Sequence, residues 1–174
     1  VKSLINTKNG IFVTESHYAV NILDEMQFDS IYHEHLRFYL LRPLIFLLNK
    51  YGFKVIDASR IPNYAGSIRV TATLNKNIQP KKSVKKLINQ EKKRGFYSEK
   101  KYKQYADKVI KVKKDLTELL WKLRLKRKRI VGVGCPGRSI TLLAYCNITN
   151  QLIDYIAEQS SCLLYTSPSP RDVP

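Results

Sequence analysis

Residues 129–148 read RIVGVGCPGRSITLLAYCNI, and this stretch decides the fold of the C-terminal part of the chain. It predicts a strand over residues 129–133 and a helix over residues 139–146, joined by a glycine-rich turn. A second strand is expected over residues 151–156. Residues 129–161 therefore predict the start of a Rossmann-like βαβ domain.

The turn between this strand and helix contains Gly132, Gly134 and Gly137, spaced as G-x-G-x-x-G. One interpretation is a nicotinamide dinucleotide site, with the pyrophosphate at the helix N-terminus and Glu158 as the acidic residue that follows about 20 positions on. A second interpretation is a site for the pyrophosphate of a nucleotide sugar. A third is a tight turn that binds nothing, and the spacing alone leaves all three open.

The segment before this stretch carries most of the charge of the chain. The 174 residues have a net charge of +17, and residues 81–129 hold 20 Lys/Arg against 5 Asp/Glu. Apolar residues recur there every three or four positions, which predicts two amphipathic helices separated at Gly95. The lysines then form either solvated helix faces or a phosphate-binding face. No nucleic-acid-binding signature accompanies them, so nucleic acid is an alternative rather than the expected partner.

The N-terminal residues predict alternating strands and helices. A mostly apolar run over residues 11–15 is typical of a buried strand in a parallel sheet. Pro43 suits the first position of a helix, and Gly52 suits the position after its end. A strand follows over residues 53–56, and residues 68–74 alternate between apolar and polar as a half-buried strand does. The order predicts the back half of an α/β sheet.

Several features indicate the cellular compartment of the protein and where its native sequence ends. No apolar run reaches the roughly 18 residues of a membrane helix, no signal peptide opens the chain, and the three cysteines lack C-x-x-C spacing. A cytoplasmic protein without membrane contact is expected. Residues 162–174 read CLLYTSPSPRDVP and resemble a translated sequencing adaptor. We therefore expect a non-native tail and a chain truncated at both ends.

All three histidines lie near the N-terminus, and two of them flank a carboxylate in Tyr32-His33-Glu34-His35. A metal site is one interpretation, although no spacing rule places a third ligand. A hydrogen-bonded loop is another. A catalytic site fits the residue types better, because an imidazole can remove a proton at neutral pH and a carboxylate can orient it. A tyrosine hydroxyl can donate to a developing enolate oxygen. Together the imidazole, the carboxylate and the hydroxyl suit proton abstraction beside a carbonyl.

These residues belong to a set of ordered motifs that resembles a known family, the S-adenosylmethionine-dependent sugar C-methyltransferases. The segment FDSIYHEH is similar to the family signature F-D-x-I-Y-H-E-H. Three further segments agree in the same order: GIFVTESHY at 10–18, IPNYAGSIRV at 61–70 and VGVGCPGRSITLLAYCNI at 131–148, the last followed by T-x-x-L-I-D at 149–154. The resemblance covers residues 5–160.

The resemblance implies a domain organisation. Residues 1–78 would be the C-terminal part of a class I, Rossmann-like methyltransferase domain, residues 79–128 a basic helical connector, and residues 129–161 the start of a second Rossmann-like domain. The cofactor would be S-adenosylmethionine, bound by a loop upstream of Val1. Zinc is expected only in a missing N-terminal region.

The resemblance also implies roles for residues. His35 matches the general base that deprotonates the carbon beside the ketone of a nucleotide-linked deoxysugar, and Tyr32 and Glu34 match its neighbours. Residues expected to contact the sugar or its phosphates are Asn63, Ser67, Arg69, Gly132, Gly134, Gly137 and Arg138. Ala65 replaces a family glycine, which removes backbone freedom, and Ile140 replaces an asparagine. These departures affect the substrate more than the type of reaction.

Overall fold

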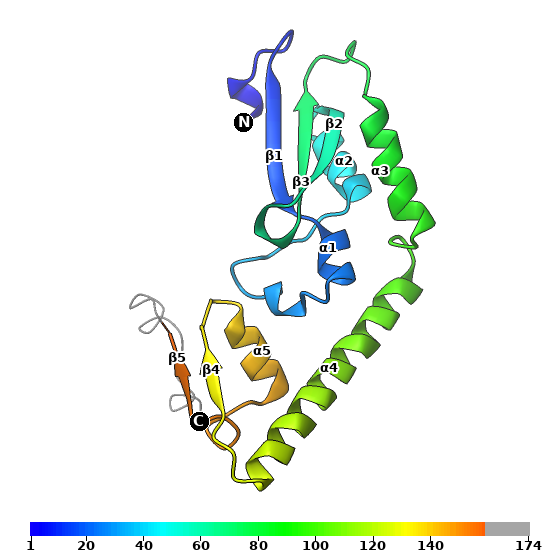
Figure 1. Cartoon of the computed structure of the whole chain (residues 1–174). Coiled ribbons are helices and arrows are strands. Elements are labelled where there is room, and N and C mark those ends of the chain that lie inside the picture. Colours follow the sequence, from blue (N-terminus) through cyan, green and yellow to red (C-terminus); the bar gives the residue numbers. More distant parts are fainter. Residues whose placement is uncertain (159–174) are drawn as a thin grey trace. The chain divides into compact units, whose positions relative to one another are not determined.

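The chain is a mixed α/β protein, as its sequence predicts. A computed structural model describes residues 1–158, so the expected non-native tail, residues 162–174, lies outside the described part. Helices and strands are interspersed along the chain (Figure 1). Within residues 1–158 no helix combines the length and the apolar character needed to span a membrane.

The chain divides into two compact units, and a short segment that interrupts the sequence of the first unit belongs to the second. The first unit comprises residues 1–26 and 37–104, and the second comprises, among the described residues, 27–36 and 105–158. Short-range sequence patterns do not predict that residues 27–36 belong to the second unit, because this segment packs with residues far along the chain.

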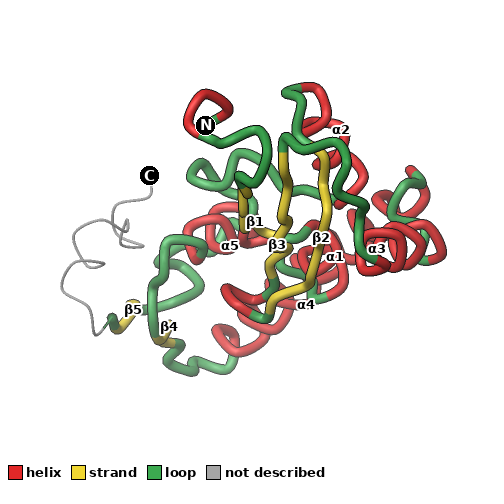
Figure 2. Tube along the Cα trace, turned by 90° about the horizontal axis from the view of Figure 1, so that it is seen from above, coloured by secondary structure: helices red, strands yellow, loops and turns green. Residues whose placement is uncertain are grey.

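The first unit is built on a three-stranded sheet. Its strands are β1 (Ile11–His17), β2 (Lys54–Ile61) and β3 (Ser67–Thr73). The spatial order is β1-β3-β2, and both pairings are antiparallel. Figure 2 shows β3 between the other two strands. The strands predicted over residues 53–56 and 68–74 are thereby confirmed, with shifted ends.

The prediction of a buried, parallel-type strand over residues 11–15 is wrong. β1 pairs antiparallel with β3 and lies at an edge, where Ile11 and Val13 are 58% and 54% exposed. Only the alternate side chains, such as Phe12, pack against the core of the unit. An apolar run does not by itself distinguish a strand buried on both faces from an edge strand with apolar side chains on both faces.

The core of the first unit lies on one face of this sheet. Ile68, Val70 and Ala72 of β3 are completely buried, as their alternation in sequence predicts. They belong to one apolar cluster with residues of α2 (Leu41–Lys50) and α3 (Lys82–Lys93). Burial of this set supplies the main stabilisation of the unit, at about 25 cal/mol per Å² of apolar surface.

The ends of α2 show how local chemistry sets a boundary. The helix begins at Leu41, so Pro43 is its third residue and not its first. This position is still compatible with proline, because the first turn of a helix has amides without helical acceptors. Gly52 follows the helix with φ of +87°, a conformation that suits glycine, and its predicted role at the helix end is confirmed.

A buried carboxylate joins three elements of the first unit. Glu91 of α3 is 1% exposed. Its Oε1 accepts hydrogen bonds from the Tyr18 hydroxyl at 2.7 Å and from the Leu41 amide at 2.8 Å. Its Oε2 accepts a hydrogen bond from the Tyr97 hydroxyl. Tyr18 directly precedes α1 (Ala19–Asp24), so a single side chain holds the start of α1, the start of α2 and the turn after α3.

The two helices predicted in the basic segment are confirmed. α3 ends at Lys93, Gly95 follows with φ of +75°, and α4 (Glu99–Leu125) then runs for 27 residues. α4 starts within the first unit and continues into the second. Buried apolar residues on α4 are few, namely Val109 and Leu120, and lysines cover much of its surface.

The second unit contains a two-stranded parallel sheet, α5 (Ser139–Cys146) and the part of α4 from Tyr105 onward, and residues of both helices belong to its apolar cluster. In sequence order β4 (Val131–Val133) comes first, α5 follows and β5 (Tyr155–Ala157) comes last, and the two strands pair with each other. α5 has the predicted bounds, while both strands are shorter than expected. This strand–helix–strand order with parallel strands is the βαβ arrangement that the glycine-rich stretch predicts.

An ion pair near the end of α4 connects this helix to the residues around the two strands of the second unit. Arg124 Nη1 lies 2.8 Å from Asp154 Oδ1, and the Ile130 amide donates to Asp154 Oδ2 at 2.7 Å. The Ile130 amide, followed by Arg124, lowers the pKa of Asp154. The carboxylate thus ties the end of α4 to the loop that begins β4.

Candidate functional site

Residues 27–36 carry the predicted catalytic side chains and belong to the second unit. The segment opens with a 3-10 turn, Phe28–Ser30, in which the Ser30 amide donates to the Gln27 carbonyl at 3.1 Å. The buried Phe28 ring packs edge-on against Tyr145 of α5, with 5.5 Å between centroids. This contact anchors the segment to α5.

Tyr32, Glu34 and His35 lie together in one turn. The His35 amide donates to the Tyr32 carbonyl at 2.9 Å, which closes the turn. The imidazole of His35 meets the Tyr32 ring edge-on, with 4.8 Å between centroids and 86° between the planes. The Tyr32 hydroxyl donates to Glu34 Oε2 at 3.3 Å. The carboxylate therefore contacts the phenol, whereas the residue types alone suggested a carboxylate that orients the imidazole.

The surroundings of Tyr32 favour its protonated form. Burial, followed by the negative charge of Glu34 and their hydrogen bond, raises the pKa of Tyr32, and Arg138 opposes this shift. The phenol remains protonated at neutral pH and can donate a hydrogen bond. A neighbouring oxygen that gains negative charge is a suitable acceptor for it.

The glycine-rich turn lies beside this cluster in the same unit. A Cβ added at Gly137 would lie 4.0 Å from Cε2 of Tyr32, so the turn passes close to the phenol ring. Arg138 Nε pairs with Asp29 Oδ2 at 3.0 Å. Asp29 was not among the predicted site residues, although it stands within the quoted FDSIYHEH motif. The structure therefore brings Arg138 and Gly137 to the segment that holds Tyr32, Glu34 and His35.

The backbone of the turn explains two of its glycines. Gly134 has φ of +79°, and its amide donates to Ala157 of β5 at 2.8 Å. A Cβ at Gly132 would lie 3.1 Å from a side-chain carbon of Ile156, so glycine permits the close pairing of β4 and β5. The Cys135 amide donates to the Glu158 carboxylate. A carboxylate held on this turn disfavours an anionic group at the same amide and disfavours Glu158 as a ribose ligand.

A cavity of about 400 Å³ opens in the second unit next to this segment. Its lining is mainly aromatic and aliphatic and consists of Phe28, Ile31, Tyr105, Ala106, Val109, Ile110, Thr141 and Tyr145. The Tyr105 hydroxyl is buried and has no hydrogen-bond partner among residues 1–158. Burial, followed by the charge of Asp29, raises the pKa of Tyr105 to about 12. The cavity thus offers aromatic surface together with one buried hydroxyl.

Three predicted substrate contacts, Asn63, Ser67 and Arg69, belong to the first unit. The Ser67 hydroxyl donates to the Asn63 carbonyl at 3.3 Å. Arg69 donates to Glu15 Oε2 from Nε at 3.1 Å and from Nη2 at 2.9 Å. Glu15 was not a predicted site residue, although it is the glutamate of the quoted GIFVTESHY motif. Its position directly opposite Arg69 follows from the strand register, which the motif does not contain.

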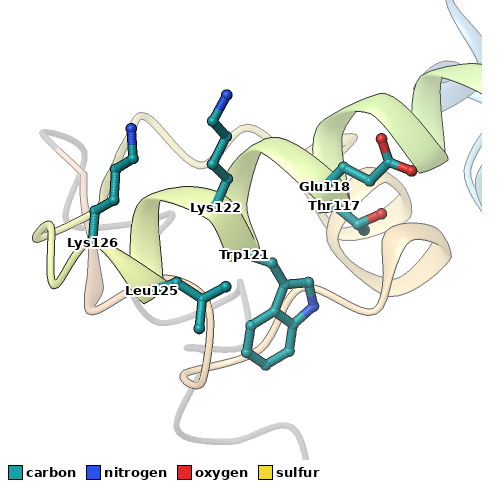
Figure 3. Close-up of a pocket in the computed structure, with 6 residues that line it drawn as sticks. All are labelled: Thr117, Glu118, Trp121, Lys122, Leu125 and Lys126. Atoms are coloured by element: carbon teal, nitrogen blue, oxygen red, sulfur yellow. The ribbon is translucent and has the colours of Figure 1, made fainter.

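Neither the end of α4 nor the acidic, histidine and cysteine side chains of residues 1–158 form a second candidate site. A hollow of about 540 Å³ near the end of α4 is lined by consecutive turns of that one helix, with Trp121 and Leu125 on one side and Lys122 and Lys126 on another (Figure 3). Across the described residues, no group of three or more His, Cys, Asp or Glu side chains is placed to hold a metal ion. The His33 and His35 pair therefore lacks a third ligand within residues 1–158.

Comparison with known proteins gives the family. Residues 62–163 match the family described as "C-methyltransferase C-terminal domain". The chain belongs to this family. It is also similar to C-methyltransferase NovU of Streptomyces niveus, with 29% identity over 159 residues. The resemblance inferred from the motifs is thereby confirmed.

The extent of this match defines what part of a protein the chain represents. The aligned region covers 90% of this chain but 37% of the relative from Streptomyces niveus. The family match includes β3, both basic helices and the βαβ unit, while the Tyr32–His35 turn lies outside it. Family membership thus concerns the C-terminal domain most directly.

Proposed function

We propose that the chain is part of an S-adenosylmethionine-dependent C-methyltransferase that methylates the carbon beside the ketone of a nucleotide-linked deoxysugar. The observation that carries this proposal is the single turn that holds Tyr32, Glu34 and His35, with the phenol and imidazole rings 4.8 Å apart. Membership of a C-methyltransferase family supports the reaction type. A cytoplasmic protein that needs neither membrane nor nucleic acid is proposed with it.

The side chains have complementary roles in this proposal. His35 takes the proton from the carbon beside the ketone, and the electron pair of that bond moves toward the ketone oxygen. Tyr32 donates its hydroxyl proton in a hydrogen bond to this oxygen, which stabilises the enolate. Glu34 accepts a hydrogen bond from the Tyr32 hydroxyl at 3.3 Å and holds it in place before the substrate arrives.

The methyl donor requires residues beyond those described. S-adenosylmethionine, when bound, supplies an electrophilic methyl group for the enolate carbon. We propose that the loop that binds this cofactor lies upstream of Val1 in a longer protein. The zinc-binding region is placed there too. In this proposal the methyltransferase domain ends with residues 1–78. The connector is residues 79–128, and the second domain starts with residues 129–161.

The nucleotide part of the substrate is assigned to the second unit. Arg138 supplies a guanidinium, which suits a phosphate, and the turn with Gly132, Gly134 and Gly137 precedes the N-terminus of α5. Glu158 occupies the Cys135 amide, so the proposal assigns the phosphate to the helix end beside Arg138 and not to that amide. The nearby cavity of about 400 Å³ has an aromatic lining that suits a planar base. Asp29 pairs with Arg138 through Nε, so the proposal assigns the two terminal nitrogens of this guanidinium to the phosphate.

The test is a pair of matched substitutions in a longer protein that includes the cofactor loop. His35→Asn should abolish methyl transfer to the nucleotide-linked ketosugar while calorimetric binding of S-adenosylmethionine stays unchanged. His33→Asn is the control, since this exposed neighbour has no role in the proposal, and it should retain most of the activity. Unchanged turnover in His35→Asn would show that His35 is not the base.

A second test uses the present chain alone. Without the cofactor loop it should transfer no methyl group from S-adenosylmethionine to a nucleotide-linked ketosugar, as measured by mass spectrometry of the sugar product. Methyl transfer by this chain would contradict the placement of the cofactor site upstream.

A further inference from the structure

Four polar side chains form a compact cluster at one end of the sheet in the first unit. Glu15 on β1 lies directly opposite Arg69 on β3, and His17 lies directly opposite Ser67. Residues two apart in a strand point to the same face, so all four side chains share one face of the sheet. The opposite face carries the buried core residues of β3. The cluster is therefore a local polar site and not a scatter of surface residues.

The charges of this cluster compensate each other. The two hydrogen bonds that Arg69 donates to Glu15, at 2.9 and 3.1 Å, both go to Oε2, which leaves Glu15 Oε1 as an acceptor. The side chains are 47% and 27% exposed, so the pair is accessible from outside. Arg69 holds Glu15 with both Nε and Nη2, so this edge of the guanidinium is not open to the bidentate contact that a phosphate uses, and the carboxylate repels a phosphate. Neutral hydroxyl groups have no such penalty and can both donate and accept.

A cavity accompanies the cluster. It has a volume of about 210 Å³ and is lined by Glu15, Ser16, His17 and Ser67. That volume exceeds the roughly 30 Å³ share of one water molecule severalfold, which suits a small polar molecule or one sugar ring. The His17 ring packs edge-on against Phe38 with 6.0 Å between centroids, and the Ser67 hydroxyl donates to Asn63. Both groups are thereby oriented before a ligand binds.

We propose that Glu15, His17, Ser67 and Arg69 form a charge-neutral subsite that binds the hydroxyl groups of a neutral sugar ring. Glu15 Oε1 accepts from one hydroxyl, and the Ser67 oxygen accepts from another, because its own proton is donated to Asn63. The inference rests on the proposed function, which supplies a sugar as substrate. It goes further by assigning this cluster to the sugar ring and not to a phosphate, and by adding Glu15 and His17 to the binding residues.

The experiment is an NMR titration of the ¹⁵N-labelled 174-residue chain. Methyl α-D-glucopyranoside serves as the neutral sugar and inorganic phosphate as the anion, each added to the same concentration. The sugar should shift the amide signals of His17 and Ser67 in a saturable way, and phosphate should leave them unmoved. Equal or larger shifts with phosphate, or no shift of these signals with the sugar, would overturn the proposal.

Matched variants test the role of the carboxylate. Glu15→Gln removes the charge-assisted acceptor and should weaken sugar binding by about tenfold. Glu99→Gln is the control, because this glutamate is exposed and pairs only with Lys103 on the surface of α4. Ser67→Ala gives a second measurement if the spectrum of Glu15→Gln shows a loss of fold. Sugar affinity unchanged in both Glu15→Gln and Ser67→Ala would also overturn the assignment.

The result can be separated from a failure of the proposed function. If this cluster binds a sugar but the longer protein transfers no methyl group, the proposed function fails and the subsite is retained. Methyl transfer by a longer protein whose Glu15→Gln variant keeps an unchanged KM would leave the function standing and exclude the subsite.

Discussion

The buried carboxylate of Glu91 gives the sharpest prediction for stability. It accepts hydrogen bonds from the Tyr18 hydroxyl, the Leu41 amide and the Tyr97 hydroxyl, and it is 1% exposed. Glu91→Gln keeps the shape of the side chain but replaces a charged acceptor with a neutral amide. The substitution therefore isolates the contribution of the charge to the packing of α1, α2 and α3.

The expected loss follows from the number of hydrogen bonds. A hydrogen bond to a charged group contributes about 1.5–3 kcal/mol and a neutral one about 0.5–1.5 kcal/mol, so each bond loses about 1 kcal/mol. Three bonds give a loss of about 3 kcal/mol, a large part of the roughly 5–15 kcal/mol that stabilises a domain. At a denaturant slope of about 2 kcal/mol per M, the urea midpoint should fall by about 1.5 M.

The two units can be followed separately in one unfolding experiment. Exchange of the Leu41 amide with solvent reports the first unit, while fluorescence of Trp121, the single tryptophan, reports the second. Glu91→Gln should shift the first transition and leave the second in place. The control Glu99→Gln removes an exposed pair with Lys103 and should change stability by less than about 0.5 kcal/mol. An unchanged first transition would refute the reasoning, since it would mean that burying the charge offsets its hydrogen bonds.

Three further predictions concern single backbone and side-chain features. Burial, followed by the hydrogen bond to Glu91, raises the pKa of Tyr18 above its ordinary 10.0, so the neutral phenol stabilises the fold below that pH and the contribution is lost as pH rises. Urea unfolding above about pH 10 should show a slope of about 1.4 kcal/mol per pH unit from this group, and Tyr18→Phe should remove it. Ala65 has φ of +61°, so Ala65→Gly should raise the thermal midpoint by relieving about 1 kcal/mol of strain, and no rise would contradict that strain. Gly66→Ala should destabilise more than Gly134→Ala in urea unfolding, because its Cβ would lie 2.0 Å from an Asn21 nitrogen while the other enters open space; equal losses would show that backbone strain alone decides.

Local pattern was sufficient where one segment determines its own structure. The helix over residues 139–146 has its predicted bounds, and the alternation of Ile68, Val70 and Ala72 places all three in the core. Gly95 separates the two basic helices as expected. In each case the periodicity of apolar residues or a glycine with positive φ carries the information within a few positions.

The remaining features depend on partners far along the chain. Nothing in residues 11–15 specifies antiparallel pairing with β3, because the partner lies more than 50 positions away. The same holds for Glu15 and Arg69, whose pairing requires the register. Glu91 stands in a lysine-rich amphipathic helix and resembles a solvated residue, yet it faces three donors from other elements. Sequence reasoning found the turn with Tyr32 and His35 through its motif, but not the hydroxyl–carboxylate contact within it.

The basic segment illustrates how structure changes the meaning of a charge count. Residues 81–129 include arginines that already have partners inside their own unit. Arg94 lies 2.6 Å from Asp24 and stacks over the Phe96 ring, and Arg124 pairs with Asp154. A guanidinium held in this way is less free to form the bidentate contact that phosphate recognition uses. The exposed lysines that remain are point charges along a helix surface, which supports solubility and a diffuse attraction of anions rather than a specific site.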